Sequence, residues 1–473
     1  MKNIIIVGGG TAGLVTALIL KTKFNANIKI IKSDEIGIIG VGEGSTEHWQ
    51  DFMGFCGIDY KELIKETDAT IKLGIYFTGG WAKNNFYHNI SSHKTLFKFG
   101  QTNYGLLQSL SKNEKPISTT NYLNLENLVP NFIDESPSNQ YHFNTFKLNS
   151  FLLKKCREKK IDVIQDTIKE VNVNQEGISS LIGSKKYKAN FYIDCTGFKR
   201  LLISKLGAKW ISYSKHFNLN EAIAFPTEDT NEYTPYTESK KMNAGWMWRI
   251  PTYGRWGNGY VFNSNVINAD TALQEAENNR GHSIKDVRHV KFNPGALDKP
   301  LLKNCLAVGL AANFVEPLEA TSIGTTINQV FLFNNYFNHV NSKHYVNEYN
   351  NKMAAIMDNI KDFVLMHYIN DKTVQLPESL KHKLGLWKER PPIDDDFTKT
   401  HYYLFYAVNF MQILCGLDFY KSNVIKKYIN TLNKEVRSNF DARIKAKDIE
   451  YKLNRNQHIS HKQWLTNIRT KNA

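Results

Sequence analysis

Three glycines near the start of the chain have the spacing that binds a pyrophosphate. They form a G-x-G-x-x-G pattern between an apolar run, residues 4–7, and an apolar segment, residues 14–20, that suits a helix. The first glycine allows the tight turn, the second lets the backbone approach the phosphates, and the third lets helix pack on strand. Amides at the helix start then face the phosphates. The residues expected to contact a dinucleotide here are Gly8, Gly10, Thr11, Ala12 and Gly13.

An acidic residue for the ribose hydroxyls is expected about 20 residues further on. A second strand is predicted at Ile28–Ile31, and after Lys32 the chain continues with Asp34 and Glu35. Either carboxylate reaches the ribose or the contact is replaced, and Asp34 is the candidate that we name.

Three later segments have small residues where a cofactor must come close. Gly40-Val41-Gly42-Glu43 is a second glycine-rich loop, Phe191–Phe198 predicts a strand leading into a turn, and Leu306–Ala312, with Gly309, predicts a strand feeding a helix start. Each alone could be a structural turn. Together with the opening fingerprint they favour FAD over NAD, and they add Gly42, Glu43 and Gly309 to the predicted cofactor contacts. The predicted fold is α/β, with an FAD-binding Rossmann-like core of the glutathione-reductase type.

Composition indicates a globular protein. The chain has 473 residues and 42% hydrophobic content, enough for large cores, and no stretch approaches the roughly 18 apolar residues of a membrane span. The N-terminus does not resemble a signal peptide, and the five cysteines are odd in number and widely spaced. We expect a cytoplasmic protein without metal or disulfides. The net charge of +15 is spread along the chain without a basic stripe, so we expect no nucleic-acid partner.

The segment Gly245–Pro251 holds two tryptophans, Trp246 and Trp248, two residues apart. On a strand, side chains at this spacing point to the same face. The rings can therefore form a wall beside a cofactor cavity, or they can pack together in the interior of a sheet.

At this point the chain resembles the flavin-dependent halogenases of the tryptophan halogenase family. The resemblance runs from residue 1 to about residue 370, with the motifs in family order. Its strongest parts are a lysine segment, the W-x-W-x-I-P run and a P-L-E-A-T run. The motifs that carry the resemblance are the glycine fingerprint, Gly40–Glu43, Ala69–Ile75, Tyr141–Asn144, Asp194–Phe198, Gly245–Pro251, Gly257–Val261, Phe314–Thr321, Asp362-Phe363 and His367-Tyr368.

The resemblance implies a two-stage reaction. Reduced FAD, supplied by a separate flavin reductase, meets O2 to give a C4a-hydroperoxide, and halide attacks this to form hypohalous acid. Lys72 matches the catalytic lysine that hydrogen-bonds the acid or forms a haloamine. Glu319 matches the glutamate that polarises the oxidant or takes the proton from the aromatic substrate. In this setting Trp246 and Trp248 wall the flavin cavity.

The resemblance also implies a halide site at the amides of Thr321 and Ser322, which suit an anion at a helix start. Many relatives have Ser-Thr-Gly after the glutamate, whereas this chain has Ala320-Thr321-Ser322. Ser322 replaces a glycine, so we expect it to restrict the backbone. Halide preference stays open among chloride, bromide and iodide. Because bromide is easier to oxidise than chloride, at least bromide is predicted to be used.

The predicted organisation is a core at residues 1–340, with interleaved substrate-side sheet segments, and a mainly helical region at residues 341–473 that covers the substrate. The implied substrate is a small aromatic molecule, and a homo-oligomer is possible. His88, Tyr87 and Trp387 are possible pocket residues, although packing or surface roles are favoured for each.

Three alternatives to halogenation of a free aromatic stay open. A hydroxylase would share the fold, yet it does not explain the lysine, the glutamate and the tryptophans together, and Leu310 stands where hydroxylases usually have aspartate. A non-catalytic flavin or carrier-binding protein would bind FAD without product. A halogenase acting on a carrier-tethered substrate could use the basic surface to dock an acidic carrier.

Overall fold

A six-stranded sheet carries the glycine turn. The computed structural model describes residues 3–24, 26–37, 44–89, 107–112, 126–130, 140–453 and 458–470. The sheet has the order β20-β21-β12-β1-β2-β8, and its strands pair in parallel except for β20. Strands buried on both faces read as unbroken apolar runs, which explains the isoleucines of β1. The strands are β1 (Asn3–Val7), β2 (Asn27–Lys32), β8 (Asp162–Gln165), β12 (Phe191–Asp194), β20 (Leu301–Leu302) and β21 (Cys305–Ala307).

Helix α1 (Thr11–Phe24) connects the parallel strands β1 and β2, as a βαβ unit requires. Every residue from Gly13 to Leu20 is buried, because α1 lies between the sheet and three further helices. These helices are α2 (His48–Cys56), α6 (Thr145–Glu158) and α8 (Thr321–Asn334). The predicted glycine turn between strand and helix is present, and β2 is one residue longer at each end than predicted.

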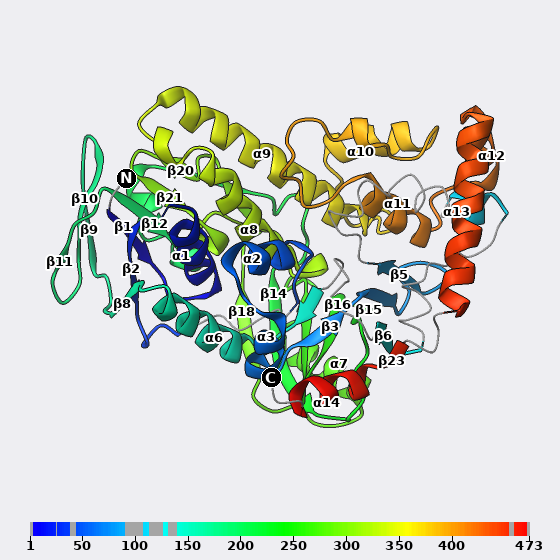
Figure 1. Ribbon diagram of the computed structural model, residues 1–473, viewed down its shortest axis with the longest axis horizontal. Coiled ribbons are helices and arrows are strands. Elements are labelled where there is room, and N and C mark those ends of the chain that lie inside the picture. The colour runs from blue at the N-terminus through cyan, green and yellow to red at the C-terminus, as the bar shows by residue number, and fades with distance from the viewer. Residues whose placement is uncertain are drawn as a thin grey trace.

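A second, seven-stranded sheet has the order β18-β14-β17-β16-β15-β4-β5. It lies beside the first sheet and its helices, towards the centre and right of Figure 1. Its strands come from residues 74–89 and 221–291, which lie on either side of β8 and β12 in the chain, so this sheet is interleaved in sequence with the first. They are β4 (Gly74–Thr78), β5 (Phe86–Asn89), β14 (Glu221–Glu228), β15 (Thr237–Met242), β16 (Gly245–Thr252), β17 (Arg255–Phe262) and β18 (Arg288–Lys291).

Small sheets fill the edges of the molecule. The strand β3 (Thr70–Lys72) pairs with β7 (Gln140–His142), and β6 (Leu128–Pro130) pairs with β23 (His458–Ser460). The remaining strands are β9 (Glu170–Asn174), β10 (Gly177–Ile182), β11 (Lys186–Tyr187), β13 (Trp210–Ser212), β19 (Gly295–Leu297) and β22 (Asn313–Phe314).

The chain beyond residue 341 is mainly helical, as predicted. Helices α10 to α13 extend towards the right of Figure 1, whereas α14 lies below, near the C-terminus. The helices not yet given are α3 (Tyr60–Thr67), α7 (Ala269–Arg280), α9 (Lys343–Met366), α10 (Glu378–Trp387), α11 (Ala407–Gly416), α12 (Ser422–Thr431), α13 (Lys434–Leu453) and α14 (His461–Thr470). The α/β fold class is confirmed, and the domain boundary near residue 340 stays a prediction.

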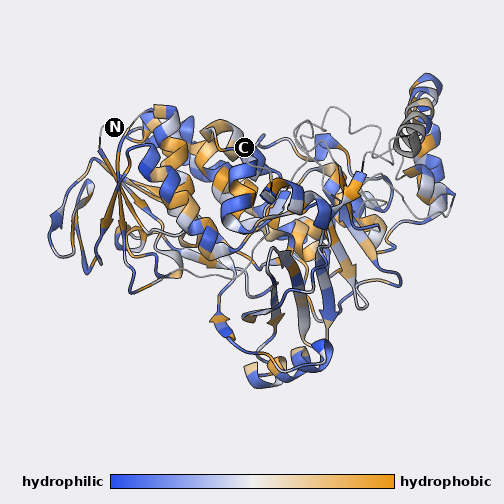
Figure 2. Ribbon diagram, turned by 60° about the horizontal axis from the view of Figure 1, so that its bottom comes forward, coloured by the Kyte–Doolittle hydropathy of each residue, from blue (hydrophilic) through white to orange (hydrophobic). Residues whose placement is uncertain are grey.

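The core follows from this layering. Apolar residues run along the strands of the six-stranded sheet, whereas the helices around it alternate apolar and hydrophilic residues (Figure 2). One large buried cluster spans β1, α1, both tryptophans of β16 and the helices α8 and α9. Among the described residues, no helix has the length and apolar character needed to cross a membrane.

Candidate active site

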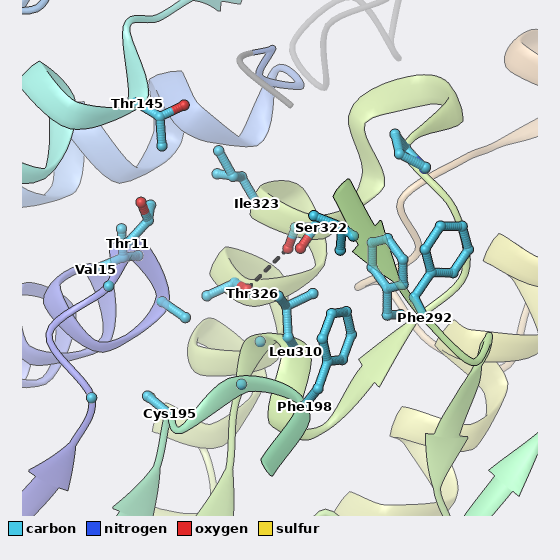
Figure 3. Close-up of a pocket in the computed structure, with 18 of the residues that line it drawn as sticks. Thr11, Val15, Thr145, Cys195, Phe198, Phe292, Leu310, Ser322, Ile323 and Thr326 are labelled. Atoms are coloured by element: carbon cyan, nitrogen blue, oxygen red, sulfur yellow. Dashed lines mark hydrogen bonds between the residues drawn. The ribbon is translucent and has the colours of Figure 1, made fainter. Parts of the chain in front are cut away.

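A cavity of about 410 Å³ lies between the two sheets. Its lining combines the glycine turn after β1 with the lysine of β3, the tryptophans of β16 and the start of α8. In Figure 3, Thr11 at the start of α1 and Cys195 just after β12 lie on one side of this cavity, across from Ser322 and Ile323 of α8. The cavity therefore joins the dinucleotide fingerprint to the residues for which the sequence predicts chemistry.

The glycine turn leaves room for a ligand. Gly8 has a φ of +122°, and a side chain there would overlap the carbonyl of Cys195. A side chain at Gly13 would overlap the carbonyl of Gly8, so Gly13 serves the contact between helix and strand. Apart from its chain neighbours and the backbone of α1, no described residue has an atom within 4 Å of the position that a Cβ would occupy at Gly10. This open cradle at a helix start fits a pyrophosphate.

Gly309 packs against the start of α1, next to the glycine turn. Its φ is +66°, and a Cβ at this position would lie 2.6 Å from the Cβ of Ala12. Because Gly309, Thr11 and Ala12 all line the cavity, the backbone around Gly309 approaches the start of α1 closely. The segment predicted as a strand feeding a helix is β21 followed by a short 3-10 turn, Gly309–Ala311.

The predicted ribose acid does not reach the cavity. The Asp34 side chain is 68% exposed and its carboxylate contacts the Lys32 ammonium. The cavity is lined instead by Ser33 and, from the end of β8, by Asp166. Lys32, two residues before Asp34, is the partner of this carboxylate, which explains the difference. Gly42 and Glu43 lie outside the described residues.

The two tryptophans of β16 face the same side, as the period of a strand predicts. Their ring centroids are 6.0 Å apart, both rings are buried, and both line the cavity. Gly259 lies opposite Trp248 on β17, where any side chain would overlap the Trp248 ring. The absence of a side chain at Gly259 therefore leaves the space that the Trp248 ring occupies.

Lys72 is the last residue of β3 and is only 2% exposed. Its ammonium donates to the Ser45 carbonyl at 2.9 Å. A Cβ at Gly44 would lie 3.6 Å from the Lys72 Nζ and 3.5 Å from the Cβ of Ala320. Lys72 and the residue after Glu319 thus lie on either side of Gly44.

Burial lowers the pKa of Lys72 from 10.5 to about 8, although the carboxylates of Glu319 and Glu47 oppose the shift. At pH 7 the side chain is mainly an ammonium, and about one tenth is the amine. It can therefore act both as a hydrogen-bond donor and as a nucleophile near physiological pH.

The strand of Lys72 is held by the far end of the described chain. The Ile71 amide donates to His461 Nε2 at 3.0 Å, and His461 Nδ1 donates to the Tyr233 carbonyl at 3.1 Å. Burial lowers the pKa of His461 to about 4, so its Nε2 stays a free acceptor at neutral pH. The first turn of α14 therefore fixes the backbone beside the lysine.

Glu319 is buried between two histidines. The Nδ1 atom of His88 lies 2.9 and 2.8 Å from its two oxygens, and the Nε2 atom of His367 lies 3.0 Å from Oε1. Burial alone disfavours the charged carboxylate, but His88 and His367 outweigh it and hold the pKa of Glu319 well below its ordinary range. Glu319 is therefore a carboxylate with hydrogen-bond donors on both sides.

The hydrogen-bond partners show which ring nitrogen of His88 carries a proton, and which groups face the ring nitrogens of His367. Asn409 accepts the Tyr406 amide with Oδ1, so its Nδ2 donates to His88 Nε2 at 3.3 Å, and the His88 proton lies on Nδ1. His367 Nδ1 faces the Phe363 carbonyl at 3.0 Å. Acceptors therefore lie beside both ring nitrogens of His367, the Phe363 carbonyl at Nδ1 and the Glu319 carboxylate at Nε2.

The start of α8 has no side-chain cap. Glu319 and Ala320 both have left-handed backbones, with φ of 66° and 53°, and α8 begins at Thr321. Thr321 and Ser322 line the cavity. The Thr326 hydroxyl donates to the Ser322 carbonyl at 2.9 Å (Figure 3). Ser322 lies within α8, and the left-handed backbones next to it are those of Glu319 and Ala320.

Three residues were considered as pocket residues with packing or surface roles favoured. His88 is buried and contacts the Glu319 carboxylate, but it is not among the residues that line the cavity. Tyr87 points to the other face of β5 and stacks on Tyr76 at 4.3 Å. Trp387 is buried and donates to Asp396 at 2.9 Å. Packing therefore accounts for Tyr87 and Trp387.

Comparison with known proteins identifies the family. A sequence model described as "Tryptophan halogenase" matches residues 3–430. The chain belongs to the tryptophan halogenase family. It is accordingly an enzyme, a flavin-dependent halogenase that uses reduced flavin, O2 and halide for electrophilic halogenation of an aromatic substrate, and the resemblance inferred from the motifs is confirmed.

Individual relatives agree over almost their full length. The tryptophan 6-halogenase SttH of Streptomyces toxytricini is 27% identical over 469 residues, which cover 88% of this chain and 89% of that protein. Tar14, a tryptophan C-6 flavin-dependent halogenase from taromycin biosynthesis, is 25% identical with a TM-score of 0.88, covering 99% of this chain and 100% of that chain. A tryptophan halogenase of Shewanella frigidimarina shares the fold, with a TM-score of 0.89, 23% identity and coverage of 99% and 98%.

Proposed function

We propose that Lys72 and Glu319 are the catalytic residues of this halogenase and that FAD lies along the glycine turn. The observation that carries the proposal is the meeting of both side chains, buried, in the cavity that the open Gly10 cradle also lines. Gly8, Gly10, Thr11, Ala12 and Gly309 would hold FAD, and Thr321 and Ser322 would hold the halide. Bound reduced FAD, with O2, supplies the oxidant that converts halide to hypohalous acid.

Lys72 would receive the hypohalous acid. As an ammonium it donates a hydrogen bond to the acid and polarises it. As an amine it displaces hydroxide from the halogen, giving a haloamine and water after proton transfer. Transfer of halogen from the haloamine to an aromatic carbon, with loss of the ring proton, regenerates the amine. The burial that lowers the pKa of Lys72 to about 8 makes both forms available.

Glu319 would stabilise the cationic aromatic intermediate and receive the proton that leaves the ring. It suits this role because His88 and His367 keep it ionised inside a buried site. The rings of Trp246 and Trp248 keep the aromatic substrate away from the flavin, so that the diffusing oxidant must pass the lysine. We infer a small aromatic substrate of the indole class, because SttH and Tar14 are named as tryptophan halogenases.

The test supplies reduced FAD through a separate flavin reductase and offers chloride, bromide and iodide with a panel of free aromatics. The wild type should incorporate at least bromide. Lys72→Ala should lose roughly 100-fold or more of the halogenation while binding FAD normally, whereas the exposed Lys169→Ala should not. Full halogenation by Lys72→Ala would overturn the assignment.

Glu319→Gln separates the two half-reactions. Because the glutamate acts on the aromatic ring, halogenation should fall more than flavin oxidation, and hydrogen peroxide should accumulate in place of product. Unchanged coupling between flavin oxidation and product would contradict the role given to Glu319.

A further inference from the structure

A second buried carboxylate, Glu316, lines the same cavity and has no assigned role. It follows β22 and is 1% exposed. Its Oε1 accepts from the Tyr368 hydroxyl at 2.6 Å and from Trp246 Nε1 at 3.3 Å. Its Oε2 is buried and has no hydrogen-bond partner among the described residues. A buried carboxylate with one oxygen satisfied twice and the other unsatisfied requires an explanation.

Glu316 and Glu319 are three residues apart and are held by two adjacent residues after α9. Tyr368 donates to Glu316, and His367 contacts Glu319. The two environments differ, because a neutral hydroxyl faces Glu316 whereas two imidazoles face Glu319. Paired carboxylates whose surroundings push their ionisation apart mark an acid and a base.

The charged groups around Glu316 come from two elements. His367 lies in the turn after α9, and Lys241 of β15 lies over the Tyr368 ring, 5.2 Å from its centroid, with Asp371 3.4 Å away. Burial raises the pKa of Glu316 to about 7, against the opposing Tyr368 and Trp246 hydrogen bonds and the charges of His367 and Lys241. Near neutral pH about half of the Glu316 side chains therefore hold a proton.

The position of that proton follows from the hydrogen bonds. Both donors, Tyr368 and Trp246, point at Oε1, so the proton belongs on Oε2. Since Oε2 has no hydrogen-bond partner among the described residues and Glu316 lines the cavity, no protein acceptor competes for this proton.

Formation of hypohalous acid needs one proton. The balance is FADH2 + O2 + X⁻ + H⁺ → FAD + HOX + H2O, in which O2 is reduced by four electrons, two from the flavin and two from the halide. A protonated side chain that lines the cavity can deliver this proton directly to the reacting atoms.

We propose that Glu316 Oε2 donates the proton consumed when halide is oxidised, with Tyr368 as the positioning residue. Glu316 is left as a carboxylate, stabilised by Tyr368 and Trp246, and recovers its proton from water before the next turnover. This inference rests on the proposed function. The two carboxylates then act in different steps: Glu316 gives a proton when the halide is oxidised, and Glu319 takes a proton from the aromatic ring.

Glu316→Gln tests the donor with little change in shape, because the amide oxygen still accepts from Tyr368 and Trp246. Infrared difference spectra of the ligand-free protein, wild type against Glu316→Gln, should show a protonated carboxyl band that titrates near pH 7 and is absent from the variant. Tyr368→Phe should move this titration to higher pH, since its hydroxyl stabilises the carboxylate. The exposed Glu176→Gln should leave the band unchanged.

With reduced FAD and bromide, hypobromous acid formation by the wild type should fall about tenfold per pH unit above 7. Glu316→Gln should be slower by roughly 100-fold and lack this inflection. The proposal is overturned if the wild type lacks the band, or if Glu316→Gln keeps the rate and pH profile of the wild type. A wild type that forms no hypohalous acid at all would overturn the proposed function as well, so the two failures are distinguishable.

Discussion

The buried ammonium of Lys72 should cost the protein stability in a way that depends on pH. In the native state burial moves the pKa of Lys72 from 10.5 to about 8, whereas in the unfolded chain the side chain returns to 10.5. Between these values the unfolded chain binds a proton that the native protein does not. Stability therefore rises with pH across this window, and the full cost is present below pH 8.

Lys72→Met removes this titration and keeps the buried methylenes. For a shift from 10.5 to about 8, linkage gives a cost of about 3.4 kcal/mol at pH 7 that shrinks to about 0.8 kcal/mol at pH 10. The stability of the wild type relative to Lys72→Met should therefore increase by roughly 2.5 kcal/mol between pH 7 and pH 10. The lost hydrogen bond to Ser45 shifts both values by the same amount, so it does not affect this difference.

The assay is urea denaturation of wild type and Lys72→Met at a series of pH values from 7 to 10. The exposed Lys169→Met serves as control and should follow the wild type at every pH. A stability difference that stays constant across the series would show that the Lys72 ammonium is as well stabilised in the cavity as in water. The proposal that burial supplies a reactive amine would then be wrong.

Two further predictions concern the support of the site. Gly259→Ala should force the Trp248 ring aside, which should lower stability by about 1–3 kcal/mol and change tryptophan fluorescence. Gly385→Ala, where a Cβ meets open space, should change neither quantity. Equal behaviour of the two variants would refute this prediction. His461→Ala leaves the Ile71 amide without its acceptor, so urea denaturation should show a loss of about 1–3 kcal/mol. Because burial lowers the pKa of His461 to about 4, the wild type should also lose stability as pH falls from 6.5 towards 4, and a His461→Ala variant with the same acid profile would contradict this.

Local patterns predicted much of the fold and the cavity wall. The glycine fingerprint specified a strand, a turn and a helix, and the spacing of two residues on a strand placed both tryptophan rings on one face. These predictions succeeded because each depends on backbone geometry within a few residues. The ribose contact of Asp34 stays a prediction, and the structure shows this carboxylate paired with Lys32 outside the residues that line the cavity.

The supports of Glu319 could not be predicted in this way. His88 lies 231 positions before it in the chain and His367 lies 48 positions after it. Nothing in a local pattern distinguishes such a histidine from one packed in a core. The His367-Tyr368 pair was part of the family resemblance, but its roles towards Glu319 and Glu316 appear only when α9 is placed against the start of α8.

The contact between Ile71 and His461 also orders events during synthesis of the protein. The two residues are separated by 390 positions, so at ordinary rates of translation His461 is made roughly 20–80 s after Ile71. Throughout this interval the strand of Lys72 lacks one of its hydrogen-bond partners. The lysine therefore reaches its final setting only after α14 has left the ribosome, and a nascent chain cannot present a finished active site.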